Sequence, residues 1–554
     1  MDELRNLAVA NLPSTGGFLT VDDVTASDLP KVRTLEQVAD AVAGALPPFD
    51  PSAMTDEARD ALIARSPEWL AAHRATSADI AAGLELAAWP TTGGPAKGVR
   101  HTIRSVESFG ETATAAQTRA TLQAAIDASV SGQWVMTSPG VTYTVDASLV
   151  YKSGMRLIID RSEITAAAGT KIFHDNGVAV TDAIVTGFKG VVSNASASST
   201  GYGFFSDTAI NTDVWISGIE FKNLFRGVNI YRFAGLHIDN CIGRDLLSSL
   251  WAAGLVTNRS EDFYANGNRA INCGKFVPGA ENDIGFVAYC DTVRTRDNLS
   301  INGGRSENIN QVHSLYFRSC TDVESRSDGG KGHLGGSFMH VSAEASDAAC
   351  ADVDIIDARA DSCPDYYAIR VTKTNRIRII GGRLSRAGIN GMYISNANDV
   401  TIDGTTIVDA NRKGSSGAAL NAAIFLETVD DYKVRNVSMY ARVKSGAIYG
   451  MGAGIRLSVC VNGSIEGVKF ERSTDGGAAY QLFVLSGTNG RVKIRGTRCT
   501  GLSQLFAGDS GAAETSLFED CVATTMSGAW VALAANWTTY DVMYNTVQQV
   551  AARA

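Results

Sequence analysis

Two stretches of the chain carry the same short pattern. Ala-Ile-Arg-Val-Thr-Lys-Thr-Asn-Arg-Ile-Arg-Ile at residues 368–379 is followed by Gly-Met-Tyr-Ile-Ser-Asn-Ala-Asn-Asp-Val-Thr-Ile at residues 391–402. Each copy predicts a short alternating strand, a polar turn that contains asparagine, and a second alternating strand. The copies begin at residues 368 and 391, an offset of 23 residues. Self-similarity at this period predicts a solenoid in which each repeat stacks on the next.

The same pattern can be aligned along most of the chain. Regular copies start at residues 148, 227, 254, 284, 314, 368, 391, 423, 454 and 481. The second residue of each copy is apolar except at Gly285, and the fourth is apolar except at Thr257. Strand alternation turns both positions inward, where each coil covers the apolar side chains of its neighbour. Leucine-rich and helical repeats are the competing solenoids, but their consensus and period are absent.

The prolines divide the chain. Eight of the eleven precede residue 96, and a long ladder of strands tolerates few prolines because each lacks a hydrogen-bond donor. The capping box at Thr34 and Gln37 indicates a helix before this boundary. We therefore expect a small, mainly helical N-terminal domain that becomes ordered when it binds partner proteins. The predicted parts are the N-terminal domain (1–97), a linker and capping helix (98–147), the solenoid (148–545) and a tail (546–554).

Composition narrows the classes of partner. The formal net charge is −9 and there is no basic block, which argues against nucleic acid because phosphates require a Lys/Arg face. The first residues lack the features of a secretion signal, and no apolar run reaches membrane-spanning length. We therefore expect that the protein does not insert into a membrane. We also expect that it is assembled in a cytoplasm.

The cysteines argue against a disulfide framework. Their number, nine, is odd, and no two form a CxxC pair, which favours buried free thiols over disulfides or a zinc site. Cys290 and Cys320 each lie six residues after the start of a copy, so they are expected to stack. We expect no metal ion and no cofactor.

Residues before the first copies resemble the start of a known fold. A predicted helix at Thr121–Ala128, with Leu122, Ile126 and Val130 on one face, precedes a strand, a turn and the first copy of the repeat at Leu149–Ile159. This order resembles right-handed parallel β-helices of the pectate-lyase-like superfamily, especially those of bacteriophage tailspikes. The Gly-Asp-Gly and Asp-Asp residues common before that helix are absent. The resemblance covers about residues 100–545 and implies an all-β chain that forms a homotrimer.

The first strand of each copy predicts one outward column. Its later members are Phe286, Tyr316, Arg370, Tyr393, Phe425, Arg456 and Phe483. Exposed aromatic side chains stacked about 4.8 Å apart are seldom left bare to water. The column is therefore either a subunit interface, since interfaces favour Tyr, Phe and Arg, or a platform for sugar rings. In the second case Tyr316 and Tyr393 would bind substrate.

The second strand predicts another outward column. Its members are His237, Tyr264, Arg294, Glu324, Asp354, Arg378 and Thr401. Glu324 and Asp354 lie on successive coils, about 4.8 Å apart at the backbone, which is close to the roughly 5 Å separation of a retaining glycosidase pair. They are the candidate catalytic residues. Tyr264, Arg294 and Arg378 are candidates for binding the sugar, and the alternative for the whole column is a solvated ladder of charges.

The resemblance implies a function. A tailspike would attach to a phage tail or baseplate through residues 1–97, be assembled in the host cytoplasm, and recognise a bacterial surface polysaccharide with its β-helix. Whether it also cuts the polysaccharide is a separate question, because the fold hosts lyases, hydrolases and inactive binders. Two alternatives stay open: a bacterial polysaccharide lyase or hydrolase outside a virion, and a non-catalytic adhesive solenoid.

Overall fold

The computed structural model divides into two compact units, residues 1–84 and residues 85–554. From residue 103 to residue 502 the description is continuous except at residues 131, 208, 255–257, 275–281, 305–312, 334–335, 344–346, 364–365, 411–421, 443–452 and 473–480. Short strands are described on either side of this span. The predicted helices of the N-terminal domain lie outside the described residues. Strand β1 (Leu86–Ala87) pairs with β2 (Arg100–His101) in antiparallel fashion.

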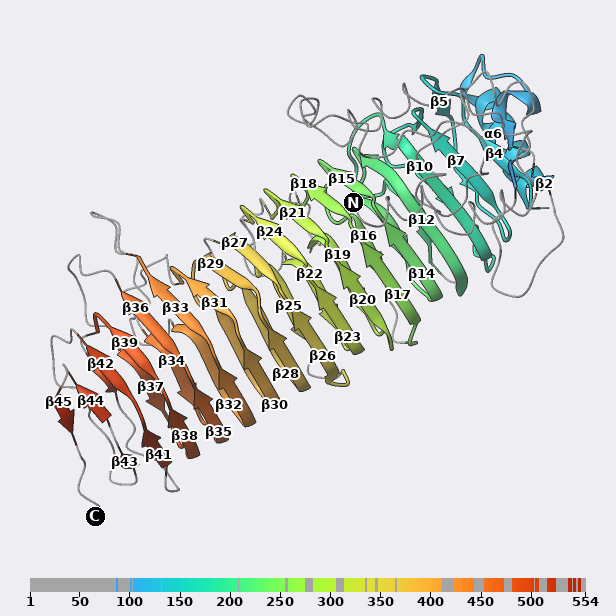
Figure 1. Cartoon of the computed structure of the whole chain (residues 1–554). Coiled ribbons are helices and arrows are strands. Elements are labelled where there is room, and N and C mark those ends of the chain that lie inside the picture. The colour runs from blue at the N-terminus through green and yellow to red at the C-terminus, as the bar shows by residue number, and fades with distance from the viewer. Residues whose placement is uncertain are drawn as a thin grey trace, which may run out of the picture. The chain divides into compact units, whose positions relative to one another are not determined.

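The second unit is a right-handed parallel β-helix, as expected. Its strands stack coil upon coil in three parallel columns (Figure 1). Long strands bend at a turn and belong to two columns: β10 (Thr181–Asn194) and β12 (Asn211–Lys222) to the second and third, and β28 (Ile369–Ile380), β30 (Met392–Asp403) and β32 (Ala422–Arg435) to the first and second.

Shorter strands complete the three columns. The first column contains β6 (Leu149–Val150), β9 (Lys171–His174), β11 (Tyr202–Ser206), β13 (Arg226–Ile230), β16 (Trp251–Ala253), β19 (Asn282–Ala288), β22 (His313–Arg318), β25 (Met339–Ser342), β34 (Ala453–Ser458), β37 (Gln481–Ser486) and β40 (Gln504–Ala507). The second contains β3 (Ile103–Ser105), β4 (Trp134–Met136), β7 (Arg156–Asp160), β14 (Phe233–Asp239), β17 (Glu261–Asn266), β20 (Val293–Arg296), β23 (Thr321–Arg326), β26 (Cys350–Ile356), β35 (Val461–Glu466), β38 (Gly490–Arg495), β41 (Ser516–Glu519) and β43 (Trp537–Tyr540).

The third column contains β5 (Thr142–Val145), β8 (Glu163–Ala166), β15 (Ile242–Arg244), β18 (Arg269–Ile271), β21 (Leu299–Ile301), β24 (Gly329–Lys331), β27 (Arg359–Cys363), β29 (Arg383–Ala387), β31 (Thr406–Val408), β33 (Ser438–Ala441), β36 (Lys469–Arg472), β39 (Arg498–Thr500), β42 (Val522–Thr524) and β44 (Val542–Tyr544). The last strand, β45 (Val547–Gln549), pairs with β44 in antiparallel fashion.

The register confirms the repeat from which the fold was predicted. Ile369 pairs with Met392 and Val371 with Ile394, and all four side chains are fully buried. The exception at Gly285 also has a physical explanation. Gly285 pairs with Trp251 of the preceding coil, and a Cβ at Gly285 would collide with the Trp251 ring. The large ring therefore uses the space that a side chain at residue 285 would otherwise fill.

Two predicted starts of copies are wrong. Val228, the second residue of its copy, pairs with Trp251. The next copy therefore begins before residue 254. Ile455 pairs with Phe483, which is fully buried, and the outward residue is Val484. A slip of one residue exchanges the two faces of a strand. Alternation could not fix the register at the second site because residues 482–484 are all apolar.

A helix covers the first coils. Helix α6 (Ala115–Ser129) begins after Thr114, whose hydroxyl accepts a hydrogen bond from the Gln117 backbone N–H at 3.2 Å. A 3₁₀ turn, η4 (Val106–Phe109), precedes it. Leu122 and Ile126 are fully buried, as predicted. Val130 is the C-cap residue and is 41% exposed, so the burial of this face does not extend to the end of the helix. No helix in the described part of the chain is long and apolar enough to span a membrane.

Polar side chains also stack inside the β-helix. Asn268, Asn298 and Asp328 lie on successive coils and are at most 1% exposed. The Asn268 side-chain amide donates to Oδ1 of Asn298 at 2.9 Å, and the Asn298 amide donates to Oδ1 of Asp328 at 2.9 Å. This ladder is built from equivalent positions of neighbouring coils.

All nine cysteines are free and buried, which confirms the prediction of buried thiols.

Candidate functional site

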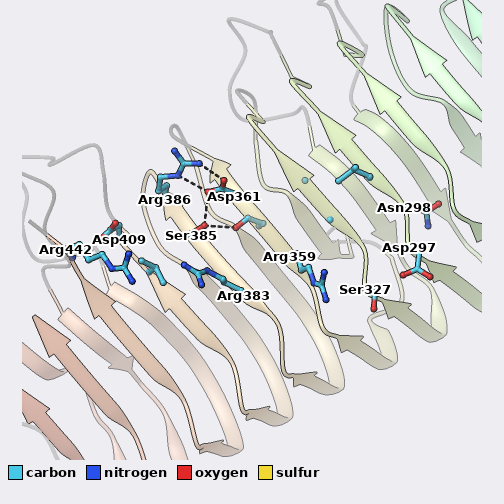
Figure 2. Close-up of a pocket in the computed structure, with 15 residues that line it drawn as sticks. Asp297, Asn298, Ser327, Arg359, Asp361, Arg383, Ser385, Arg386, Asp409 and Arg442 are labelled. Atoms are coloured by element: carbon cyan, nitrogen blue, oxygen red, sulfur yellow. Dashed lines mark hydrogen bonds and ion pairs between the residues drawn. The ribbon is translucent and has the colours of Figure 1, made fainter. Parts of the chain in front are cut away.

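A groove of about 790 Å³ runs along the outer face of the third column (Figure 2). Its walls come from five successive strands, β21, β24, β27, β29 and β31, from adjoining turns, and from Arg442 just after β33 on the next coil. Four intervals of about 4.8 Å between neighbouring strands give it a length of about 19 Å. Its charged lining consists of four arginines (Arg359, Arg383, Arg386 and Arg442) and three aspartates (Asp297, Asp361 and Asp409).

Strand register aligns two of the arginines. Arg359 of β27 pairs with Arg383 of β29. The next residues, Ala360 and Leu384, are each 1% exposed, so alternation turns both arginines outward. Among the described residues, the guanidinium groups of Arg359 and Arg383 form no ion pair or hydrogen bond, and the same holds for Arg442. Three exposed positive charges therefore line the groove without an acidic partner from this part of the chain.

The aspartates of the groove, by contrast, have partners. Asp361 accepts hydrogen bonds from Nε of Arg386 at 2.8 Å and from the Ser385 hydroxyl at 2.8 Å. The Arg386 hydrogen bond is the main cause that holds the pKa of Asp361 below its ordinary value. Oδ1 of Asp409 accepts from the Arg442 backbone N–H at 2.7 Å, and Asp297 pairs with Arg296 at 3.2 Å.

The groove is thus locally positive on a chain whose net charge is −9. Like charges opposite each other on neighbouring strands are destabilising unless something compensates them. Arginine forks match carboxylate, sulfate and phosphate groups, often with two hydrogen bonds at once. Figure 2 shows Arg359 on β27, Arg383 and Arg386 on β29, and Arg442 after β33, spaced along the groove. This arrangement can hold a long ligand with repeated negative charges.

The candidates predicted on the second strands do lie in one ladder. Tyr264 pairs with Arg294, Arg294 with Glu324, Glu324 with Asp354, and Asp354 with Arg378. The predicted adjacency of Glu324 and Asp354 is therefore correct, whereas their catalytic role stays a prediction. None of these residues lines the groove.

Both candidate catalytic carboxylates contact arginines of their own chain. Glu324 accepts a hydrogen bond from Nε of Arg326 at 3.0 Å. Asp354 accepts one from Nε of Arg378 at 2.7 Å. Arg294 donates instead to Asp322 at 2.7 Å. These contacts fit the alternative interpretation, a ladder of paired charges.

Tyr264 belongs to a stack of three aromatic rings. Its ring lies 4.5 Å from that of His237, and His237 lies 3.6 Å from Trp215, each pair within 7° of parallel. Burial lowers the pKa of His237 to about 4. Because the rings cover one another's faces, His237 has no open face on which a sugar could stack. Trp215 is 41% exposed and was missed in the sequence, since its place in the column follows only from the register.

The rings of the first column are covered to a large extent by the chain itself. Phe286 and Phe425 are 7% and 6% exposed. Tyr316 stacks on His340 at 4.7 Å, and its hydroxyl lies 2.8 Å from that of Ser342. Tyr393 donates a hydrogen bond to Glu427 and is half-buried. The aromatic column that was expected to point outward is therefore only partly accessible.

Sequence reasoning missed the arginines of the groove. They lie on third strands or just after them, and the repeat pattern covered only the first two strands of each coil. The third strands β27 and β29 have five residues each, and β31 has three. An arginine at the start of two successive third strands, Arg359 and Arg383, was the available indication.

No protein-family model and no curated protein matches this sequence. Among solved structures, tailspike protein 3 of bacteriophage CBA120 is similar over 87% of this chain and 70% of its own, with 12% identity and a TM-score of 0.43. The pre-mature gene product 12 of bacteriophage phi29 is similar over 80% of this chain and 57% of its own, with 11% identity and a TM-score of 0.47. The catalytic unit of the GH87 α-1,3-glucanase from Streptomyces thermodiastaticus strain HF3-3 is similar over 82% and 69%, with 12% identity and a TM-score of 0.32. These similarities concern the fold alone.

Proposed function

We propose that this protein is a tailspike-type receptor-binding protein of a virion and that its groove binds an acidic polysaccharide of a bacterial surface. The observation that carries the ligand class is the pair Arg359 and Arg383, two exposed arginines in register without an acidic partner among the described residues. An anionic polymer lying along the groove would compensate these charges and would contact several coils at once. The groove is open and about 19 Å long, which suits a polysaccharide rather than a small molecule.

Binding to matched ligands tests the proposal. The ligands are an acidic capsular polysaccharide and the same polymer after its carboxyl groups have been reduced to alcohols. We expect binding of the acidic form that weakens as salt is added, because the contacts are ionic. The reduced form should bind much more weakly. Equal binding of both forms would rule out the arginine groove as the recognition site.

Arginine variants locate the site. A charge-assisted hydrogen bond contributes about 1.5–3 kcal/mol, so R383A should weaken binding at least about tenfold. R359A should act similarly. The matched control is R498A, because Arg498 starts a third strand beyond the groove, is exposed and lacks a partner among the described residues. Loss of affinity in R498A equal to that in R383A would point to unspecific attraction.

Attachment to a virion and trimer formation are separate parts of the proposal. We expect residues 1–97 to bind a phage tail or baseplate protein and three chains to associate. Light scattering after size-exclusion chromatography should give three times the chain mass of 58.5 kDa. A monomer would favour the alternative of a free bacterial lyase or hydrolase. Binding without any release of new reducing ends would favour the non-catalytic adhesive solenoid.

Cleavage of the bound polymer is a second candidate function, favoured by two carboxylates in the groove. Asp361 lies on β27 and Asp409 follows β31, two coils further along. Asp361 is in register with Ser385 and Ser385 with Val408, so Asp409 lies one residue beyond the register partner of Asp361. The backbone separation is therefore about 10 Å, slightly above the carboxylate separation in inverting glycosidases. Reducing-end assays on D361N and D409N, beside E324Q and D354N, would show which pair matters. If all four variants release as many ends as the parent protein, neither pair is catalytic.

A further inference from the structure

Three side chains that commonly bind metals meet at the ends of β9 and β11, outside the groove. His174 is the last residue of β9, Asp175 follows it, and Asp207 follows the last residue of β11. The two strands pair in parallel, with His174 opposite Phe205, which brings the ends of both strands to the same edge. A ring nitrogen of His174 and one oxygen from each carboxylate lie within 4.8 Å of one another.

Two of these side chains present buried atoms that lack a partner. Asp175 is 0% exposed. Its Oδ1 accepts a hydrogen bond from the Gly177 backbone N–H at 3.0 Å, but its Oδ2 is buried without a hydrogen bond. Nε2 of His174 is also buried without a hydrogen bond, and lies 3.7 Å from Oδ1 of Asp175, which is too far for one.

Nothing in the described part of the chain compensates the buried charge fully. No lysine or arginine there forms an ion pair with Asp175. A buried carboxylate is costly unless it is paired, hydrogen-bonded throughout, or bound to a cation. The unsatisfied oxygen of Asp175 and the unsatisfied nitrogen of His174 point to a cation shared by both.

We propose that His174, Asp175 and Asp207 bind one divalent transition-metal ion, with Mn²⁺ or Zn²⁺ preferred over Ca²⁺. An imidazole nitrogen suits Zn²⁺, and carboxylates suit Mn²⁺, whereas Ca²⁺ takes six to eight oxygen ligands. Zinc ligands lie 2.0–2.2 Å from the ion and so no more than about 4.4 Å from each other. A small side-chain rotation closes the observed arrangement to that size. The ion would tie β9 to β11 and leave a coordination position open for water or a ligand oxygen.

Metal titration of the full chain tests the site. After treatment with EDTA, the protein is titrated with Mn²⁺, Zn²⁺ or Ca²⁺ by calorimetry, and bound metal is counted by mass spectrometry after dialysis. We expect one Mn²⁺ or Zn²⁺ per chain, weaker Ca²⁺ binding, and a higher melting temperature with the preferred ion. D175N and H174Q should each lower the affinity more than about 100-fold, because changes outside the ligand set already cost about 10–100-fold.

Controls separate a lost site from a lost fold. D213N is the matched control, because Asp213 is an exposed aspartate of β12 with φ of 52° and lies outside the cluster. It should bind metal like the parent protein. If D175N does not keep the parent circular dichroism spectrum, D207N replaces it. Binding of Mn²⁺ and Zn²⁺ by the folded variants as tightly as by the parent would overturn the proposal, and so would no binding by the parent.

Discussion

Replacing Asn268 by alanine tests the ladder of buried amides. Asn268 is 0% exposed and its side chain makes three hydrogen bonds. Its Oδ1 accepts from the Cys241 backbone N–H at 2.8 Å, and its amide donates to the Ile238 carbonyl at 2.7 Å and to Oδ1 of Asn298 at 2.9 Å. The alanine variant leaves the Cys241 N–H buried without an acceptor.

The expected cost follows from these contacts. A hydrogen bond contributes about 1 kcal/mol net, and a buried donor left without a partner costs about 1–3 kcal/mol. We therefore expect N268A to lower the free energy of unfolding by about 3 kcal/mol. In a solenoid each coil contacts mainly its neighbours. The loss of stability in N268A should therefore be concentrated in the coil of Asn268 and the coils next to it.

Two measurements check this prediction. Urea unfolding followed by circular dichroism gives the free energy of unfolding, and hydrogen exchange should show faster exchange of the Cys241 amide. The control is N398A, since Asn398 is exposed and donates only a long hydrogen bond, 3.4 Å, to Asn375. It should change stability by less than about 0.5 kcal/mol. Equal losses in N268A and N398A would refute the ladder argument.

Two further predictions concern buried side chains. His313 and His340 are buried, with Nε2 of His313 2.8 Å from Nδ1 of His340, and burial holds both pKa values well below the ordinary value. The unfolded chain takes up these protons below a pH of about 6.5 while the native state does not. Melting temperature should therefore fall as the pH drops from about 7 to about 5, and less steeply in H313Q/H340Q; an unchanged slope would contradict the assignment. G285A should cost about 3 kcal/mol in urea unfolding, because the new methyl group meets the Trp251 ring. The same substitution should cost less in a W251A background, and additive losses would show that the two sites do not share the space.

Much of the β-helix could be predicted because the interior repeats. Inward apolar residues such as Ile369 and Met392 recur with the coil, and the outward ladder from Tyr264 to Arg378 follows from the same alternation. The errors occurred where apolar residues follow one another, as at Leu482 and Phe483, and alternation gives no choice between the two faces.

The sequence by itself determined the class of fold, the inward columns and the buried free thiols, because strand alternation and coil length are local properties of the chain. Only the tertiary structure decided which outward residues are accessible and which are partnered. Glu324 and Asp354 are adjacent, but each contacts an arginine, whereas Arg359 and Arg383 have no acidic partner in the described chain. The contact of Asp361 with Arg386, and the proximity of His174 to Asp175 and Asp207, depend on turn lengths and coil stacking. Alternation along one strand predicts neither the accessibility of an outward side chain nor its partner.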